Sequence, residues 1–261
     1  MQDNDLVLHA RQGAIALLTI NRPKALNALN RDVLASLSAR LDEVAADRTV
    51  RAVVLTGAGD KAFVAGADIA EMATMTPRQA LAFAQAGNAI LNKIEQMPKP
   101  VVAAVNGYAL GGGCELALAC DVILASRKAR FGLPEVSLGV IPGFGGTQRL
   151  ARLIGRNAAK HWVLTGDLFP AEEAWRIGLV YQIHEPEALA AAALEVAEHM
   201  AKRGPVAVAE AKHVINRGVQ LPLSAAIELE AGAFARCFLS QDQREGMAAF
   251  LEKREPHFTG E

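Results

Sequence analysis

NGYALGGGCE, residues 106–115, is the segment from which the predicted architecture of this chain follows. It comes after an apolar run, 101–105, that is typical of a buried β-strand. It leads into 115–120, where Leu and Ala favour a helix. The order predicts a strand, a turn built from the glycines 111–113, and the start of a helix.

This junction offers hydrogen-bond donors to whatever lies in the turn. The first amides of a helix have no partner within the helix and lie at the positive end of its dipole. Glycine also lets another molecule approach the backbone closely. Three glycines by themselves would more often make only a tight turn, so the argument for a binding site depends on the acidic residues that follow.

Two glutamates lie in segments that are otherwise apolar. Glu115 stands among Leu, Ala and Cys, and Glu135 is the sole acidic residue in the run 131–141, just after Pro134. A carboxylate is costly to bury unless it is paired or has chemistry to perform. Two such carboxylates beside a donor-rich turn fit an acid and a base acting on a substrate whose oxygen the turn polarises.

Three segments in order carry a resemblance to a known family: KAFVAGADI at 61–69, AVNGYALGGGCELALACD at 104–121, and FGLPEVSLGVIPGFGGTQRL at 131–150. Together they resemble the crotonase family, most closely enoyl-CoA hydratase of the short-chain type. The resemblance extends from NRPKALNAL, residues 21–29, to the end of the chain. It implies an α/β fold, a crotonase-like spiral of ββα units with a helical C-terminal subdomain.

The resemblance also implies the site and the reaction. Glu115 and Glu135 would be catalytic, and the backbone amides of Ala67 and Gly112 would form an oxyanion hole. The reaction would be the reversible addition of water to a 2-trans-enoyl-CoA, giving a 3-hydroxyacyl-CoA, with no metal and no cofactor beyond the CoA of the substrate. Ten further residues would contact that acyl-CoA substrate: Lys24, Ala25, Leu26, Ala65, Gly66, Asp68, Ile69, Gly111, Leu133 and Pro134.

The later part of the chain is expected to be helical. Strands alternate with helices up to about residue 184, after which helical patterns follow one another without strands. We therefore expect a core over 1–200 and a helical subdomain over 201–261, with no independent second domain. The resemblance implies that this subdomain serves oligomerisation or covers the pocket, in trimers that commonly pair into hexamers.

Composition narrows the classes of partner. The chain has 261 residues, 51% of them hydrophobic, and a formal net charge of −1 without a run of like charges. That balance is typical of a soluble globular protein and argues against nucleic acid or an anionic membrane as a partner. Residues 1–13 lack the pattern of a secretory signal. Three cysteines without Cys-x-x-Cys spacing favour reduced thiols, and thus the cytoplasm.

Several other patterns in the sequence favour lesser roles. The sequence 57–62 matches the dinucleotide pattern G-x-G-x-x-A, but no helical period follows it, so we interpret it as a loop. The six histidines lack zinc spacing. Lys24 and Lys99 are expected to be solvated, and Asp121 to be structural. The helix predicted to open at Gly145 offers amide donors and thus a second possible anion site.

Pattern and capping signals place the main elements. Asn30 is a suitable N-cap for the first helix. Strands are expected at 6–9, 14–20, 50–55, 121–125, 129–131 and 179–184, and helices at 30–46, 77–96, 145–153, 158–164, 171–177, 186–202, 205–217, 222–238 and 242–253.

Alternative functions remain open from the sequence. An enoyl-CoA isomerase of the same family needs one carboxylate where this chain has two. Leu133 stands where short-chain hydratases often carry Gln, and Ala70 where Lys often follows GADI. These departures would suit a hydratase of a branched or dicarboxylic enoyl-CoA. A non-catalytic member that binds RNA or protein belongs to another class, and RNA binding would require a basic stripe that the sequence lacks.

Overall fold

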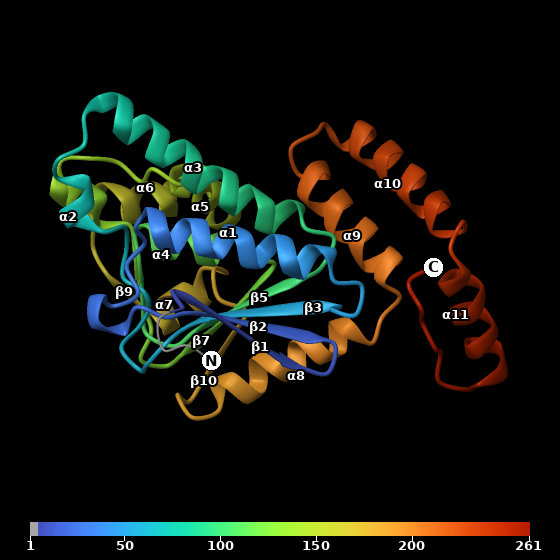
Figure 1. Cartoon of the computed structure of the whole chain (residues 1–261). Helices are drawn as coiled ribbons and strands as arrows, with labels where there is room; N and C mark the ends of the chain where they lie inside the picture. The colour runs from blue at the N-terminus through green and yellow to red at the C-terminus, as the bar shows by residue number, and fades with distance from the viewer. Residues whose placement is uncertain (1–4) are drawn as a thin grey trace.

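The computed structural model describes residues 5–261, and two β-sheets form its centre (Figure 1). The expectation that residues 1–13 do not form a secretory signal falls partly on residues 1–4, which lie outside the described residues. The larger sheet has the strand order β1 (Val7–Gln12), β2 (Ile15–Ile20), β3 (Ala52–Gly57), β5 (Val101–Val105), β7 (Val122–Ser126) and β10 (Gln182–His184). The smaller sheet has the order β4 (Ala62–Val64), β6 (Tyr108–Leu110), β8 (Arg130–Gly132) and β9 (Phe169–Pro170).

Successive turns of the chain contribute one strand to each sheet. The pairs β3 and β4, β5 and β6, and β7 and β8 each begin in the larger sheet and continue into the smaller one. Helical segments follow every pair, and within each sheet these strands lie parallel to one another. This is the spiral of ββα units that the sequence resemblance implied.

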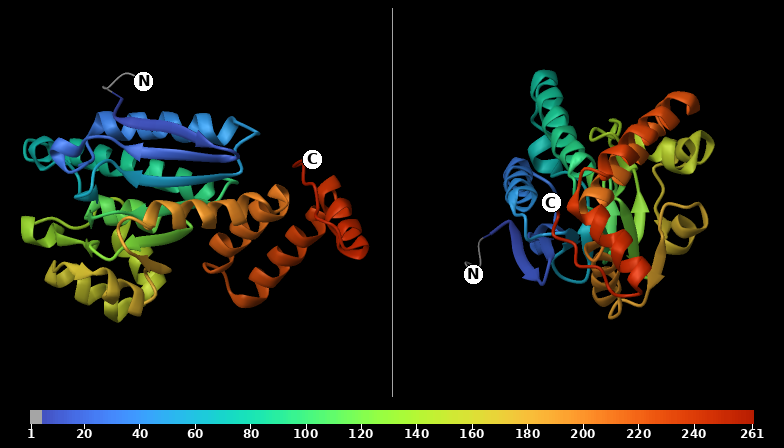
Figure 2. Two further views of the ribbon diagram at one scale, coloured as in Figure 1. Left: turned by 90° about the horizontal axis from the view of Figure 1, so that it is seen from below. Right: turned by 90° about the vertical axis from the view of Figure 1, so that its right-hand side faces the viewer.

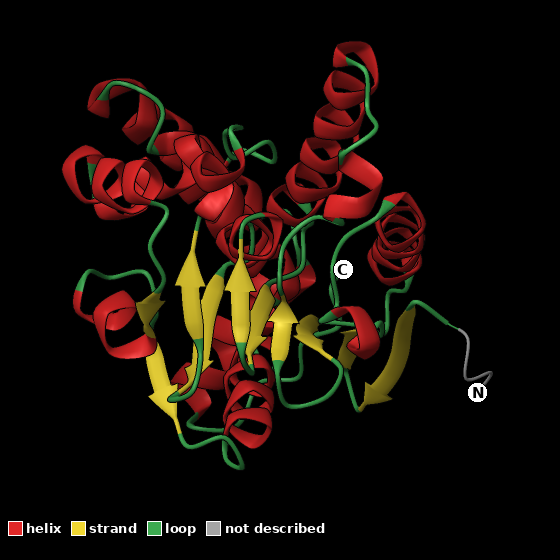
Figure 3. Cartoon of the chain, turned by 90° about the vertical axis from the view of Figure 1, so that its left-hand side faces the viewer, coloured by secondary structure: helices red, strands yellow, loops and turns green. Residues whose placement is uncertain are grey.

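Helices cover both faces of the larger sheet (Figure 3). On one face, α8 (Leu189–Ala201) packs against alternate residues of β3, β5 and β7. On the other face, the intervening residues of these strands pack in the main core with α1 (Arg31–Ala46) and α3 (Pro77–Gln96). Parallel strands covered in this way are apolar throughout, which explains their nearly continuous Val, Leu and Ala composition.

Local signals in the sequence fix the ends of the two long helices. Asn30 caps α1 by accepting a hydrogen bond from the Val33 amide, as predicted. Thr76 and Gln79 form a capping box at the start of α3, where Pro77 occupies the first helical position. The predicted limits of α3, 77–96, are confirmed.

Shorter helical segments connect the strands: η1 (Pro23–Ala25), α2 (Ile69–Met72), α4 (Gly112–Leu118), η2 (Pro134–Leu138), α5 (Gly146–Ile154), α6 (Arg156–Thr165) and α7 (Ala171–Arg176). The C-terminal helices are α9 (Pro205–Gly218), α10 (Leu223–Cys237) and α11 (Gln241–Glu252). They lie together at one end of the molecule, beyond the sheets (Figure 2). The division at residue 200 stays a prediction. None of the helices within 5–261 combines the length and apolarity that a membrane span requires.

A buried lysine joins α9 to the core. The ammonium of Lys212 donates to the Asp121 carboxylate at 2.7 Å and to the carbonyl oxygens of Ile94 and Lys99 at 2.9 and 3.1 Å. Asp121 in turn accepts from the Val101 amide at 2.7 Å. The predicted structural role of Asp121 is therefore confirmed.

The structure corrects three expectations. The strand predicted over 179–184 is limited to β10, and the strands β4 and β6 were not predicted. These two have only three residues each, too few to show a period of two. Lys99 was expected to be solvated, but it is partly buried and donates to the carbonyl oxygens of Val44 and Asp47.

Candidate active site

The central glycine turn places a helix start directly beside Glu135. Gly111 is the N-cap of α4 with a φ of +48°, a conformation that favours glycine. A Cβ at this position would lie 2.7 Å from the Glu135 Oε1 atom. Glycine is thus required at residue 111 both for the turn and for the approach of the carboxyl group.

A second turn, at Gly66, lies against the first. A Cβ built on Gly66 would be 3.6 Å from the carbonyl oxygen of Leu110, the residue before the central turn. The Gly66 carbonyl accepts from the Leu29 amide at 2.8 Å. Within residues 5–261, neither the Ala67 amide nor the Gly112 amide has a hydrogen-bond partner. The structure therefore brings the two predicted donors to neighbouring turns and leaves both without an internal acceptor.

The Glu115 carboxylate is buried and anchored. Its side chain projects from α4, the residue is 1% exposed, and Oε1 accepts from the amides of Phe144 at 2.8 Å and Gly146 at 2.6 Å. Burial raises the pKa of Glu115 to about 7. The Glu135 carboxyl also raises this pKa, whereas the two amide hydrogen bonds and Arg149 lower it. One Glu115 oxygen is thus fixed by the protein.

Glu135 lies in η2, and its carboxyl group is less constrained. The Oε2 atom is buried without a hydrogen-bond partner among the described residues. Burial raises the pKa of Glu135 to about 7. The loop after α6 packs against η2, where a Cβ at Gly166 would lie 2.9 Å from the Ser137 hydroxyl. A buried acceptor without a partner is rare in folded proteins, which points to a ligand or water at this place.

The predicted CoA-binding segments lie side by side. The Ala65 amide donates to the Leu26 carbonyl at 3.0 Å, and Leu29 forms a parallel bridge with Ala67. This pairing brings Lys24 and Ala25 of η1, and Leu26 just after it, next to the segment that holds Ala65, Gly66, Asp68 and Ile69. The side chains of Lys24 and Ile69 are exposed and accessible to a ligand.

Asp68 has internal partners. Its carboxylate accepts from the Arg22 guanidinium at 2.7 Å and from the amides of Ala70 and Glu71 at the start of α2. The hydrogen bond from Arg22 lowers the pKa of this carboxyl group. The Asp68 side chain therefore stabilises the turn that carries the Ala67 amide. Its predicted contact with the substrate stays a prediction.

Leu133 and Pro134 flank Glu135 from different environments. Leu133 is fully buried, and Pro134 occupies the first position of η2. The presence of Leu at residue 133 leaves no side-chain hydrogen-bond donor there for Glu135, consistent with the unpartnered Oε2 atom. The two carboxyl groups thus differ: amides of two other residues anchor Glu115, whereas the one amide that lowers the pKa of Glu135 is its own.

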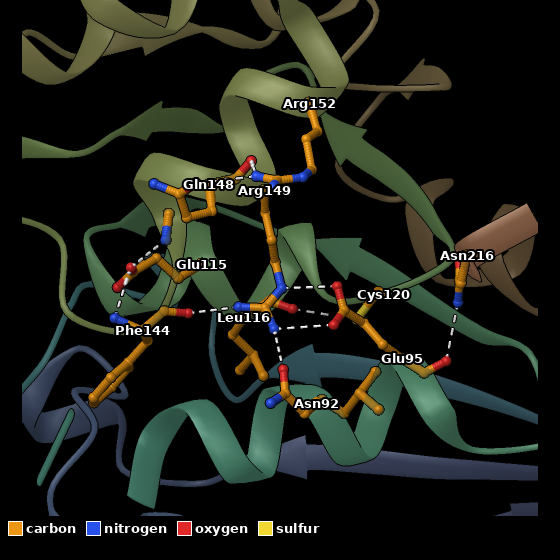
Figure 4. A network of polar contacts seen from close by, with 12 residues as sticks. Asn92, Glu95, Glu115, Leu116, Cys120, Phe144, Gln148, Arg149, Arg152 and Asn216 are labelled. Atoms are coloured by element: carbon orange, nitrogen blue, oxygen red, sulfur yellow. Dashed lines mark hydrogen bonds and ion pairs between the residues drawn. The ribbon is translucent and has the colours of Figure 1, made fainter. Parts of the chain in front are cut away.

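Sequence reasoning missed the residues that hold Glu115. Phe144, Gly146 and Arg149 surround it from the loop before α5 and from α5 itself (Figure 4). The signal was present in the glycine-opened helix at 145, which was predicted as a second possible anion site. The anion it receives is the carboxylate of Glu115.

Other predicted patterns do not enter this site. Gly57 ends β3, and the chain continues through a turn into β4, so the dinucleotide pattern opens no helix. In the part of the chain that the structure describes, no group of three His, Cys, Asp or Glu side chains comes together as metal ligands would.

Comparisons with known proteins agree with this geometry. The family described as "Enoyl-CoA hydratase/isomerase" matches residues 10–261. The "Short-chain-enoyl-CoA hydratase" of Clostridium acetobutylicum is 50% identical over 254 residues, which cover 97% of each chain. The "Crotonyl-CoA hydratase" of Syntrophomonas wolfei is 48% identical over 252 residues, again covering 97% of each chain.

Solved structures show the same architecture. The crystal structure of an enoyl-CoA hydratase from Bacillus anthracis superimposes with a TM-score of 0.95 at 40% identity, covering 98% of this chain and 100% of the other. An enoyl-CoA hydratase subunit from Geobacillus kaustophilus gives 0.93 at 43% identity, covering 98% of both chains. With a family match over nearly its whole length and half of its residues shared with one relative, this chain belongs to the enoyl-CoA hydratase/isomerase family.

Proposed function

We propose that this chain is an enoyl-CoA hydratase that adds water reversibly to a 2-trans-enoyl-CoA, with Glu115 and Glu135 acting on one water molecule. The observation that carries the roles is the buried Glu115 carboxyl group together with the half-buried Glu135, whose Oε2 atom is buried, beside two amides that lack partners. The full-length similarity to named hydratases supports the reaction.

The Ala67 and Gly112 amides are proposed to bind the thioester carbonyl oxygen. As water adds to the β-carbon, electrons move onto this oxygen and the thioester becomes an enolate. Fixed donors bind that charge more strongly than they bind the ground-state carbonyl, and one such donor is typically worth about 3–4 kcal/mol of barrier. Supporting this role, both amides are free of internal acceptors in the described residues.

The two glutamates are proposed to divide the proton transfers. Glu115, whose ionised form the amides of Phe144 and Gly146 favour, takes a proton from water as the oxygen bonds to the β-carbon. Glu135, whose Oε2 has no donor that favours ionisation, gives a proton to the α-carbon as the enolate collapses. The product is a 3-hydroxyacyl-CoA. The net change is redox neutral, so the proposal includes no redox cofactor. The two amides and the two carboxyl groups carry every proposed step, so no step is assigned to a metal.

The substrate is proposed to be a short-chain enoyl-CoA, such as the C4 thioester, held along η1 and the segment 65–69. The names of the two relatives support short chains. The exposed side chain of Lys24 supports contact with the CoA moiety, because it offers a cation on the segment that pairs with residues 65–67. A rate profile over C4 to C16, branched and dicarboxylic enoyl-CoA thioesters tests this choice, and a maximum above C8 would contradict it.

Oligomerisation through the C-terminal helices is part of the proposal, as a trimer or a pair of trimers in the cytoplasm. Phe234 of α10 and Phe250 and Leu251 of α11 are 65%, 83% and 79% exposed, which is unusual for large apolar side chains of a monomer. Light scattering after gel filtration measures the assembly. A monomer at micromolar concentration would contradict this part of the proposal.

The reaction is tested by following loss of the enoyl-thioester absorbance of crotonyl-CoA. Hydratase activity with little conversion of a 3-enoyl-CoA is expected, because hydration uses both carboxyl groups whereas the isomerase alternative needs one. Dominant double-bond migration would instead favour the isomerase.

A further inference from the structure

Arg149 lies behind the amides that hold Glu115. Its Nη1 atom donates to the Phe144 carbonyl oxygen at 2.7 Å (Figure 4). That carbonyl belongs to the peptide that joins Phe144 to Gly145. The two amides that bind Glu115, of Phe144 and Gly146, belong to the peptides immediately before and after it. Fixing the middle peptide therefore restricts the direction of both donors.

The backbone at Gly145 allows this approach. Gly145 has a φ of +91°, and a Cβ at this position would lie 2.4 Å from the Arg149 Nη1 atom. A side chain here would displace the guanidinium from the Phe144 carbonyl. The close contact is thus built into the loop that supplies the donors.

Arg149 is itself held in place from α3. Its Nε and Nη2 atoms donate to the two Glu95 carboxylate oxygens at 2.8 and 3.0 Å, and Nη2 also donates to the Asn92 side-chain oxygen at 2.7 Å. The Arg149 side chain is 13% exposed. A bidentate ion pair of this kind fixes the plane of a guanidinium as well as its position.

We propose that Arg149 is a positioning residue for the hydration reaction, which aims the Glu115 carboxylate through the Phe144–Gly145 peptide. The inference rests on the proposed role of Glu115. The alternative is that Arg149 only joins α5 to α3 and contributes to stability, as a buried ion pair elsewhere in the protein would.

The two roles differ in their effect on pH dependence. The charged groups that face the Glu115 carboxyl are Arg149 from α5 and Glu135 from η2, with Glu95 of α3 behind Arg149. The adjacent Cys114 thiol of α4 is held neutral, because burial raises its pKa. Removing Arg149 takes away the cation that favours the ionised base. A structural contact would instead affect the amount of folded enzyme and leave the pH profile in place.

The first experiment compares Arg149→Met with Arg152→Met. Arg152 is an exposed residue of the same helix that donates to Gln148, so it is a matched control. We expect Arg149→Met to lower kcat by roughly 10- to 100-fold with KM changed less than about threefold. The acidic limb of its kcat/KM profile should move to higher pH, whereas Arg152→Met should leave kcat and the limb unchanged. An unmoved limb for Arg149→Met would overturn the proposal.

A double-mutant cycle tests whether Arg149 acts through Glu115. In the Glu115→Gln background, Arg149→Met should lower the residual kcat by less than about threefold, because the group it positions has been removed. Equal losses in both backgrounds would overturn the inference and leave the proposed function standing. Wild-type turnover by Glu115→Gln alone would overturn the proposed function together with it.

Arg149→Lys covers the case in which the Met variant fails to fold. It keeps the charge and one donor but loses the fork that pairs with Glu95. We expect Arg149→Lys to lose less kcat than a folded Arg149→Met variant. The acidic limb of its kcat/KM profile should also lie closer to that of the wild type. Wild-type kcat in Arg149→Lys, with circular dichroism confirming the fold, would also contradict the proposal.

Discussion

Replacing Glu135 by Gln should make the protein more stable at alkaline pH while inactivating it. Burial raises the pKa of the Glu135 carboxyl from its usual 4.5 to about 7, so the folded state binds this proton more tightly than the unfolded state does. The wild type therefore loses stability as the pH rises from 4.5 to about 7, and it stays at the lower level above that. Glutamine does not titrate, so the variant avoids this loss.

The magnitude follows from the distance between the two pKa values. One pKa unit corresponds to about 1.4 kcal/mol, so the wild type loses about 2 kcal/mol of folding stability between pH 5.5 and pH 7. The unfolding free energy of Glu135→Gln minus that of the wild type should thus become more positive by about 2 kcal/mol between pH 5.5 and pH 8.5. Loss of the repulsion between Glu135 and Glu115 acts in the same direction.

Urea unfolding followed by circular dichroism measures this difference at the two pH values. One protein concentration is used throughout, because assembly makes apparent stability depend on concentration. Glu187→Gln, which changes an exposed glutamate, is the control and should show no change with pH. If the difference in unfolding free energy between Glu135→Gln and wild type is the same at both pH values, the ionised Glu135 carboxylate does not destabilise the folded protein and the reasoning is refuted.

Three further predictions concern turnover. Glu115→Gln should lower kcat by roughly 10²- to 10⁴-fold while binding of a CoA thioester, measured by calorimetry, persists; near-normal kcat would remove this residue from the chemistry. The wild-type kcat/KM should be bell-shaped with its maximum near pH 7, because burial raises the pKa of both catalytic carboxyl groups to about 7, and a flat profile from pH 5 to 9 would contradict this. Gly112→Pro introduces a residue that the first helical position tolerates, but proline has no backbone N–H and so removes one oxyanion donor. A loss of roughly 10²- to 10³-fold in kcat is expected. Full activity of the folded variant would show that this amide is not used.

The long elements could be predicted from the sequence because each carries its own local signals. The limits of α3 follow from a capping threonine and Pro77 at one end and prolines at the other. The central strands β3 and β5 of the larger sheet are buried on both faces and therefore appear as continuous apolar runs. The strands β4, β6 and β9 of the smaller sheet are two or three residues long and depend on pairing with distant segments, which no local pattern reports; the short strand β8 was predicted one residue early, at 129–131.

The site could be predicted only as far as its residue types are unusual. Glu115 and Glu135 stand out because their neighbours are apolar. Arg149 has no such contrast: in the sequence it is one basic residue of an amphipathic helix, and its partner Glu95 lies 54 residues away. Its importance depends on a contact with the backbone carbonyl of Phe144, and the glycine at 145 that allows this contact does not by itself point to a distant arginine.

The lysine that joins α9 to the core makes the C-terminal helices hard to remove. A chain shortened after α8 would strand the Asp121 carboxylate with no cation and would strip the carbonyl oxygens of Ile94 and Lys99 of their donor. These carbonyls belong to the last turn of α3 and the loop after it, beside Glu95. Removing α9 to α11 would therefore disturb Glu95, which holds the arginine behind Glu115. We expect the shortened chain to be inactive even when it is mixed with full-length chains.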